Sequence, residues 1–426
     1  MSKKYLIGLD VGTSGAKCII ADSEGTVVAS STQEYPLYTP KPGWAEQDPK
    51  DWWDAVVRGL KVILQKSKVD PADIAGISYS GQMHGLVALD ERCEVIRPSI
   101  LWCDQRTQAQ CDWITEKAGG LEKLLTYTNN RMLTGYTGGK ILWLRDEEPE
   151  NFRRMKIFVC PKDYIRFRMS GKLGMDVSEA SGTGFFDTKN RRWSDELIAI
   201  AGLDKAIFPE AFESTELAGT VTKECAQETG LPEGLNCYYG GGDAVIQTTG
   251  AGLVKQGILG VVIGTSGNVS MALDHFENNP NGDLQMFCGN EPGLWLAFGC
   301  TLTAGGAYRW YRDELCKAEG FITPGVDVHH IHPVETAKTV QEMERLAYNP
   351  NNCQLLCIPC HIKVHQDMRT HTKEKVKENK ERARQRFLEM NDPNYQPTEQ
   401  PKPYGQQADE YLKNLEERAR LETLTD

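Results

Sequence analysis

The sequence has no long apolar run and no recognisable leader. A membrane-spanning helix needs about 18 to 20 consecutive apolar residues, and no stretch of the 426 residues is that apolar. The first residues, MSKKYLIGLDVG, contain a short apolar stretch that runs directly into Asp10 and has no small-residue cleavage site after it. We therefore expect a cytoplasmic protein that has no membrane partner.

Histidine is scarce in the first three quarters of the chain. Only His84 and His275 precede residue 320, whereas six of the eight histidines lie between residues 329 and 371. The 13 cysteines are odd in number and scattered, which favours reduced, buried thiols over a disulfide framework. This uneven composition predicts two unrelated modules joined end to end, with the boundary near residues 312–320.

Positive charge is also in deficit. The formal net charge of -11 excludes a protein that coats nucleic acid over its whole surface. Residues 363–386 differ from the rest, because they hold nine Lys or Arg against four Asp or Glu. A local basic segment of this kind is suited to a phosphate backbone.

Two apolar strands are each followed by a Gly-Thr-Ser-Gly turn and a second strand, at residues 5–22 and 259–274. This internal repeat, about 250 residues apart, predicts two related halves of one bilobal fold. Such turns offer backbone N–H groups and hydroxyls to phosphate oxygens, and Asp10 is placed to hold a metal on them. Tight hairpins without a ligand are the alternative. Residues 49–66 have apolar positions at helical spacing, with Asp51 as the expected N-cap.

A carboxylate follows three glycines in the segment GGGDAV. Asp243 can accept a proton from an attacking hydroxyl in phosphoryl transfer, although a turn-capping role remains the alternative. The segment GQMHG, residues 81–85, puts Met83 and His84 on a glycine-flanked loop. A single histidine on a loop does not decide between a structural and a catalytic role.

These segments resemble the FGGY carbohydrate kinases, and within that family the xylulokinases. The resemblance covers residues 5–319 and rests on GLDVGTSGAK, GWAEQDPKDWW, GQMHG, RPSILWCDQRT, FVCPKDYIRFRMSG, GGGDAV and GTSGNVS, which occur in the family's order. It implies an α/β, actin-like (RNase H-like) kinase lobe that binds ATP with Mg2+ and phosphorylates a ketopentose. The segment around Ala244 differs from some members, which leaves the sugar open.

The resemblance also implies roles for individual residues. Asp243 would be the general base, and Met83 and His84 would line the sugar with the segment that carries Trp102, Asp104 and Arg106. The phosphate loops would be formed by Asp10, Thr13 and Lys17 in the first half and by Gly264, Thr265 and Ser266 in the second.

The resemblance to the kinases stops near residue 319, where family members continue through a second lobe. We therefore expect a truncated second lobe at residues 246–319 after a complete first lobe at residues 1–245. The strands of the partial lobe would expose an apolar face, which predicts poor stability, a dimer or aggregation, and largely lost ATP affinity.

The later histidines have a definite spacing. His330 precedes Asn352 by 22 residues, and Asn352 precedes His361 by nine. His329 and His361 can ligate one divalent ion, Asn352 can tie the loop, and His330 can take a proton from a water that attacks a phosphodiester. Surface or core positions for these histidines are the alternative.

This second set resembles the HNH endonucleases, whose core is a small ββα-metal module. The resemblance covers residues 316–390 and leads us to expect a module at residues 320–390 that ends in a charged helix. It implies double-stranded DNA as a partner. A polar linker and short helix would fill residues 391–426. Many members also hold a structural Zn2+, for which Cys316, Cys357 and Cys360 match three ligands; Cys316 can instead belong to the kinase segment.

Several functions remain open at this point. The chain can be a sugar kinase impaired by its truncation and fused to a nuclease, or the nuclease module can be the only active part. It can also be a sugar-binding remnant or an inactive recombination product.

Overall fold

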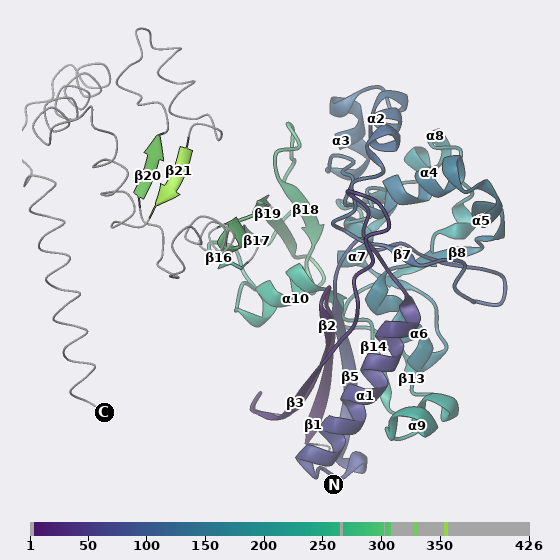
Figure 1. Cartoon of the computed structure of the whole chain (residues 1–426), viewed down its shortest axis with the longest axis vertical. Coiled ribbons are helices and arrows are strands. Elements are labelled where there is room, and N and C mark those ends of the chain that lie inside the picture. The colour runs from purple at the N-terminus through teal and green to yellow at the C-terminus, as the bar shows by residue number, and fades with distance from the viewer. Residues whose placement is uncertain (1–3, 265–266, 302, 308–326, 331–352, 357–426) are drawn as a thin grey trace, which may run out of the picture. The chain divides into compact units, whose positions relative to one another are not determined.

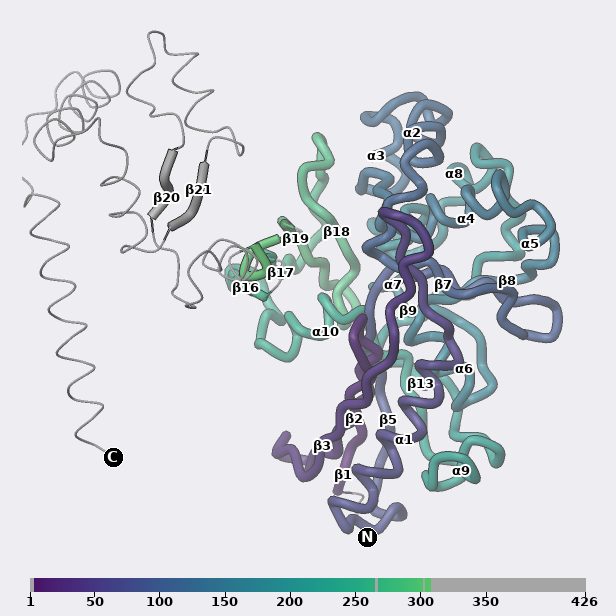
Figure 2. The backbone as a smooth tube through the Cα atoms, in the orientation of Figure 1, coloured from purple at the N-terminus to yellow at the C-terminus, as the bar shows by residue number. Residues whose placement is uncertain are grey.

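The computed structural model describes residues 4–264, 267–301, 303–307, 327–330 and 353–356. The chain divides into two compact units, the first of residues 1–263 and 267–301 and the second of residues 264–266 and 302–426. Figures 1 and 2 show the first unit as a coloured ribbon and tube. Within the described residues, no helix combines the length and apolar character needed to cross a membrane.

A seven-stranded sheet with the order β13-β14-β5-β1-β2-β3 forms the base of the first unit, and β15 pairs beside β14 on β5. Strands β1, β2 and β3 are antiparallel neighbours, whereas β5 is parallel to β1, and β14 and β15 are parallel to β5. The strands span β1 (Tyr5–Val11), β2 (Gly15–Asp22), β3 (Val27–Glu34), β5 (Ile74–Gly81), β13 (Leu217–Thr220), β14 (Asn236–Tyr238) and β15 (Gly241–Gly242).

Helices cover the face of this sheet on which Ile7, Leu9 and Val11 are buried. Helix α1 (Pro49–Ser67) packs on β2 and β3, and α6 (Pro161–Ser170) packs on β5 beside it, with α9 (Lys223–Thr229) next to both. The alternation of apolar residues along β1 places every second side chain in this core. Figure 1 shows the long α1 ribbon running alongside the strands.

Helix α1 begins one turn earlier than the predicted cap. Asp48, not Asp51, is the N-cap, and its side chain accepts a hydrogen bond from the amide of Lys50. Pro49 occupies the first helical position, where its missing N–H costs nothing. The residue before this proline is therefore the natural cap, and Asp51 lies inside the first turn.

A second core lies beyond the end of the sheet and contains most of the remaining helices. Figure 2 shows α2 and α3 at the end of the unit farthest from the N-terminus. The helices are α2 (Gln108–Lys117), α3 (Leu121–Thr128), α4 (Thr137–Glu147), α5 (Pro149–Arg154), α7 (Val177–Ser181), α8 (Asp195–Ile200) and α10 (Asp243–Gly250), with a short 3-10 turn at Lys205–Ile207. A second 3-10 turn, Pro71–Asp73, directly precedes β5 of the main sheet. The first unit also contains four small strand pairs: β4 (Glu46–Gln47) with β7 (Ser99–Ile100), β6 (Val87–Leu89) with β8 (Ile157–Val159), β9 (Met175–Asp176) with β12 (Ala211–Phe212), and β10 (Phe186–Asp187) with β11 (Arg192–Trp193).

After α10, an antiparallel sheet with the order β16-β17-β19-β18 ends the first unit. Its strands are β16 (Leu259–Ile263), β17 (Gly267–Leu273), β18 (Gln285–Cys288) and β19 (Trp295–Thr301). One face contributes Ala272 and Phe298 to the second core. On β16, by contrast, Leu259, Val261 and Ile263 are exposed.

The second unit contributes one described strand pair. Strands β20 (Asp327–His330) and β21 (Cys353–Leu356) are antiparallel, with His330 opposite Cys353 and His329 opposite Gln354. Strand β20 therefore ends on the adjacent residues His329 and His330.

Candidate active site

Asp10 and Asp243 lie on either side of the last residues of β5. Ser80 of β5 is the register partner of Asp10 on β1 and also of Gly241 on β15. Because β1, β5 and β15 are parallel, their carboxyl ends meet at one edge of the sheet, the usual location of ligand sites in such folds. The Ser80 hydroxyl donates to Asp10 Oδ1 at 2.9 Å. Two carboxylates that are far apart in the sequence thus come to one edge.

Asp243 is electrostatically suited to accept a proton at neutral pH. It lies at the first turn of α10, partly buried. Burial raises the pKa of its carboxyl to about 7, and the negative charge of Asp10 adds to the rise. Asp243 Oδ1 accepts a hydrogen bond from the amide of Ala244 at 2.7 Å. A group with a pKa near the working pH is an effective general base.

The turn after β1 is bound to the neighbouring loops through Thr13. The indole Nε1 of Trp102 donates to Thr13 Oγ1 at 2.9 Å, and that hydroxyl lies 3.3 Å from Gln82 Oε1, which accepts from it. The Thr13 carbonyl accepts from Gln47 Nε2 at 2.7 Å. Lys17 is exposed on β2 and is the register partner of Asp10, so both side chains belong to the same face of the sheet.

Glycines allow the turn before Asp243 to pack against β5 and the GQMHG loop. Gly240 has a φ of +71°, and an added Cβ would come within 1.9 Å of the Tyr79 carbonyl oxygen. A Cβ on Gly242 would meet the side chain of Met83 at 2.6 Å. Met83 therefore lies directly beside the turn that carries Asp243, and its role in lining the sugar stays a prediction.

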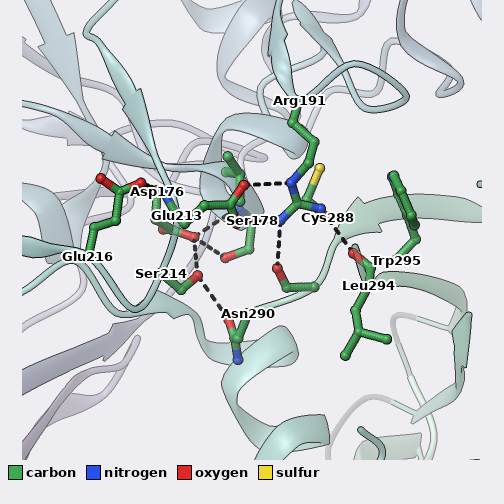
Figure 3. A network of polar contacts seen from close by, with 12 residues as sticks. Asp176, Ser178, Arg191, Glu213, Ser214, Glu216, Cys288, Asn290, Leu294 and Trp295 are labelled. Carbon is green, nitrogen blue, oxygen red and sulfur yellow. Dashed lines mark hydrogen bonds and ion pairs between the residues drawn. The ribbon is translucent and has the colours of Figure 1, made fainter. Parts of the chain in front are cut away.

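A buried polar network, which sequence reasoning missed, supports the same turn from the other side (Figure 3). The amide of Gly242 donates to Ser178 Oγ at 3.0 Å, and this hydroxyl donates to Asp176 Oδ2 at 2.5 Å. Asp176 also forms an ion pair with the fully buried Lys162 at 2.7 Å and accepts from Ser214. The only signal in the sequence is the Asp-Val-Ser start of α7, which indicates a helix N-cap.

The network continues to the hairpin between β18 and β19 through Arg191 (Figure 3). Its guanidinium makes two hydrogen bonds to Glu213, at 2.7 and 2.6 Å, and donates to the carbonyls of Leu294 and Gly289. A planar guanidinium fits a carboxylate in this bidentate way. The hairpin is thereby fixed to the strand region that surrounds Ser214.

His84 lies at the end of the GQMHG loop in an unusual conformation. Its φ is +68°, a left-handed value that non-glycine residues rarely adopt. Burial and the charge of Lys140 lower the pKa of its ring to about 3, so the ring is neutral. Its Nδ1 lies 2.8 Å from the Gly182 carbonyl oxygen, which can only accept a hydrogen bond. Nδ1 therefore carries the proton, and Nε2 is left as an acceptor.

Asp104 and Arg106 form a buried ion pair with each other. Arg106 Nη2 lies 2.6 Å from Asp104 Oδ2, and the guanidinium stacks 3.5 Å from the centre of the Trp44 ring. Asp104 Oδ2 also accepts from the amide of Ala45 at 2.7 Å, and Arg106 pairs with Glu46. These contacts give both residues a role in holding residues 44–46, and direct contact with a sugar stays a prediction.

The remaining predicted site residues are not described in side-chain detail. Gly264 follows β16, but Thr265 and Ser266 lie outside the described residues, as do Asn352, His361, Cys316, Cys357 and Cys360. For His329 and His330 only the strand is described. The second phosphate loop, the nuclease metal site and the zinc site therefore stay predictions.

Comparisons with known proteins identify the family. The model of the N-terminal domain of the FGGY family of carbohydrate kinases matches residues 5–250, more than half of the chain. The chain therefore belongs to the FGGY family of carbohydrate kinases. A second model, HNH endonuclease, matches residues 314–367.

The relatives include several xylulose kinases. The chain is 38% identical to the xylulose kinase of Bacillus subtilis over 318 residues, which are 75% of this chain and 63% of that protein. A xyloylose kinase structure from Brucella ovis matches with a TM-score of 0.68 at 34% identity, over 72% of this chain and 63% of that one. A gluconate kinase structure from Lactobacillus acidophilus matches with a TM-score of 0.70 at 30% identity, over 75% and 64%. The chain thus spans about 63% of the length of these relatives, and the predicted α/β, actin-like kinase fold is confirmed.

Proposed function

We propose that residues 5–301 form the sugar-binding and base-carrying part of an ATP-dependent kinase for a ketopentose such as D-xylulose. The observation that supports this most directly is the carboxylate of Asp243, which has a pKa near 7 and lies across the end of β5 from Asp10. Beside it lie Met83 and, on the same loop, His84, which offers a neutral ring nitrogen to a hydroxyl. The xylulose kinases among the relatives supply the substrate class.

The residues fit a phosphate-bound Mg2+. This ion usually takes one or two protein carboxylates and completes its octahedral shell with phosphates and waters. Asp10 is partly buried at the strand end and has one oxygen engaged by Ser80, so a carboxylate oxygen remains for a ligand. When bound, Mg2+ would neutralise the charge on the phosphates of ATP. Among the described residues, no cluster of three or more His, Cys, Asp or Glu side chains could hold a metal ion without a substrate.

The protein's own part in the reaction is proton transfer and orientation. The ionised carboxylate of Asp243 would accept the proton of the sugar hydroxyl as its oxygen attacks the terminal phosphorus. Met83, packed against Gly242, would exclude water from that side of the carboxylate. The hydrogen bond from Gly242 to Ser178 would keep the base in position during the transfer.

Sugar-dependent release of ADP tests this proposal. D-xylulose and D-gluconate are assayed with ATP and Mg2+, and D-xylulose binding to the same sample is measured by calorimetry. Asp243→Asn is expected to lower turnover by about 10²- to 10⁴-fold, as loss of a general base does, while the exposed Asp54→Asn leaves it unchanged. Binding without ADP release would limit the function to sugar binding. Neither binding nor release in folded protein would reject the proposal.

For the C-terminal part, we propose a metal-dependent endonuclease that acts on double-stranded DNA, in which His330 takes a proton from water and His329, Asn352 and His361 organise one divalent ion. The match of the HNH endonuclease model to residues 314–367 and the β20–β21 pair support it. Cys316, Cys357 and Cys360 are the proposed zinc ligands. Under this proposal the modules are residues 1–245, 246–319, 320–390 and 391–426.

Plasmid nicking with Mg2+ or Mn2+ tests the nuclease. Nicking that His330→Ala abolishes is the expected result. Nicking that persists unchanged in His330→Ala would point to a contaminating nuclease. Metal analysis of the same sample, with and without Cys357→Ser, tests the zinc ligands.

A further inference from the structure

The backbone of His84 is held in its left-handed conformation by side chains from other elements. Its carbonyl oxygen accepts two hydrogen bonds, from Lys140 Nζ at 2.7 Å and from Thr137 Oγ1 at 3.1 Å. A residue at φ +68° persists only where its surroundings determine the conformation. Both donors belong to α4, so this helix fixes the loop at the edge of the proposed sugar site.

Lys140 is an unusual donor, because it is fully buried without a carboxylate partner. Its second hydrogen bond also goes to a backbone carbonyl, that of Gly135, at 2.6 Å. Among the described residues Lys140 forms no ion pair, and the nearby carboxylate of Asp104 offsets only part of the effect of burial on its pKa. Burying an ammonium group among neutral partners is costly, and burial lowers its pKa to about 7. Its two hydrogen bonds to backbone carbonyls offset part of this cost.

One of the two carbonyls belongs to the loop that carries Met83 and His84, and the other belongs to a turn that packs on the Trp102 segment. An added Cβ on Gly135 would lie 2.9 Å from the carbonyl oxygen of Trp102, so the Gly135 turn packs on the Trp102 segment. The next residue, Tyr136, places its ring 4.8 Å from the His84 ring, centre to centre. Lys140 thus joins the loop that carries His84 to the turn that supports Trp102.

We propose that Lys140 is a positioning residue for the sugar site, which holds the His84 carbonyl and the Gly135 turn together so that the neutral His84 ring presents Nε2 to a sugar hydroxyl. The proposal rests on the proposed function for the role of the sugar, but not for the linkage between Lys140 and His84. A lysine that served only to fill the core would be replaceable by methionine, which has a similar length.

The experiment combines a measurement without ligand and one with D-xylulose. In the full chain labelled at the histidine ring carbons, Lys140→Met is expected to move the His84 resonance and to reduce the Nδ1–H tautomer. Lys140→Met should weaken D-xylulose binding about tenfold or more, the scale of a hydrogen bond to a charged group. In a His84→Gln background the same change should have less than about a twofold effect, because Lys140 acts through His84.

Thr137 provides the milder variant in case Lys140→Met does not fold. Thr137→Val removes the second donor to the His84 carbonyl and should move the same resonance, whereas Thr137→Ser keeps the hydroxyl and should leave it in place. An unchanged His84 resonance in folded Lys140→Met or Thr137→Val would overturn the proposal. So would an equal loss of binding in both His84 backgrounds. A wild-type chain that binds no D-xylulose would reject the proposed function, yet the resonance measurement would still decide the linkage.

Discussion

The strand pairs β1–β2 and β16–β17 share a sequence pattern but differ in their surroundings. In both, an apolar strand leads into Gly-Thr-Ser-Gly and a returning strand. Aligned on that turn, Leu9 corresponds to Val261, and the former is 2% exposed whereas the latter is 61% exposed. Asp10 corresponds to Val262, so only the first pair brings a carboxylate to its turn.

The difference shows what alternation of apolar residues can and cannot predict. It predicted two strands correctly, because every second side chain points to one face. It did not predict which strand would be buried by helices. Helices α1 and α6 pack on the face of β1, whereas the corresponding side chains of β16 are exposed. An exposed edge strand with apolar side chains and no charge invites pairing with other chains.

Truncation of Leu9 and of Val261 to alanine should give the largest difference in the free energy of unfolding between the two strand pairs. Leu9→Ala is expected to lower the free energy of unfolding by about 2–5 kcal/mol, because it removes buried methyl groups and leaves a cavity. Val261→Ala should change it by less than about 0.5 kcal/mol, as exposed positions do. Urea titration of both variants measures the difference. Similar losses in both would mean that β16 is covered in solution.

Asp243 lies near β1, across β5 from Asp10, and its ionisation should give the second largest effect on stability. The pKa of Asp243 is raised to about 7 in the folded chain, so its contribution to stability is full below its unfolded pKa and is lost as the pH rises through about 7. Asp243→Asn should therefore be more stable than the wild type at pH 8, by about 2–4 kcal/mol from the size of the shift.

At pH 4 this difference should nearly vanish. Thermal or urea unfolding at both pH values measures it, and the exposed Asp54→Asn serves as the control. A variant that is no more stable than the wild type at pH 8 would show that the folded protein ionises Asp243 without cost.

A charged side chain on the exposed strand β16 should have the smallest effect on the free energy of unfolding. It should, however, measurably reduce association between chains. Ile263 is 76% exposed, so Ile263→Lys should change the free energy of unfolding by less than about 0.5 kcal/mol. Light scattering of the purified chain should fall, since a charged edge strand resists pairing. If scattering stays the same, the apolar side chains of β16 do not drive association.

Much of the candidate site could be predicted from local sequence. Asp10 and Asp243 stand out because each ends an apolar strand beside glycines, and Met83 and His84 because glycines flank them. Asp104 and Arg106 could not be assigned in this way. Arg106 of this ion pair stacks on Trp44, which lies 62 residues earlier in the chain, and no local sequence pattern predicts that contact.

By itself, the sequence determined the strand pairs, the family and the types of residue at the site, because these depend on side-chain periodicity and on motifs of a few residues. Only the tertiary structure decided what each group does. Asp243 gains its raised pKa from burial and from a charge contributed by another strand. The hydrogen bond from Lys140 to the His84 carbonyl likewise requires α4 and the loop after β5 to pack together. Electrostatics and hydrogen bonding act over a few ångströms in space, and the sequence does not list which residues come that close.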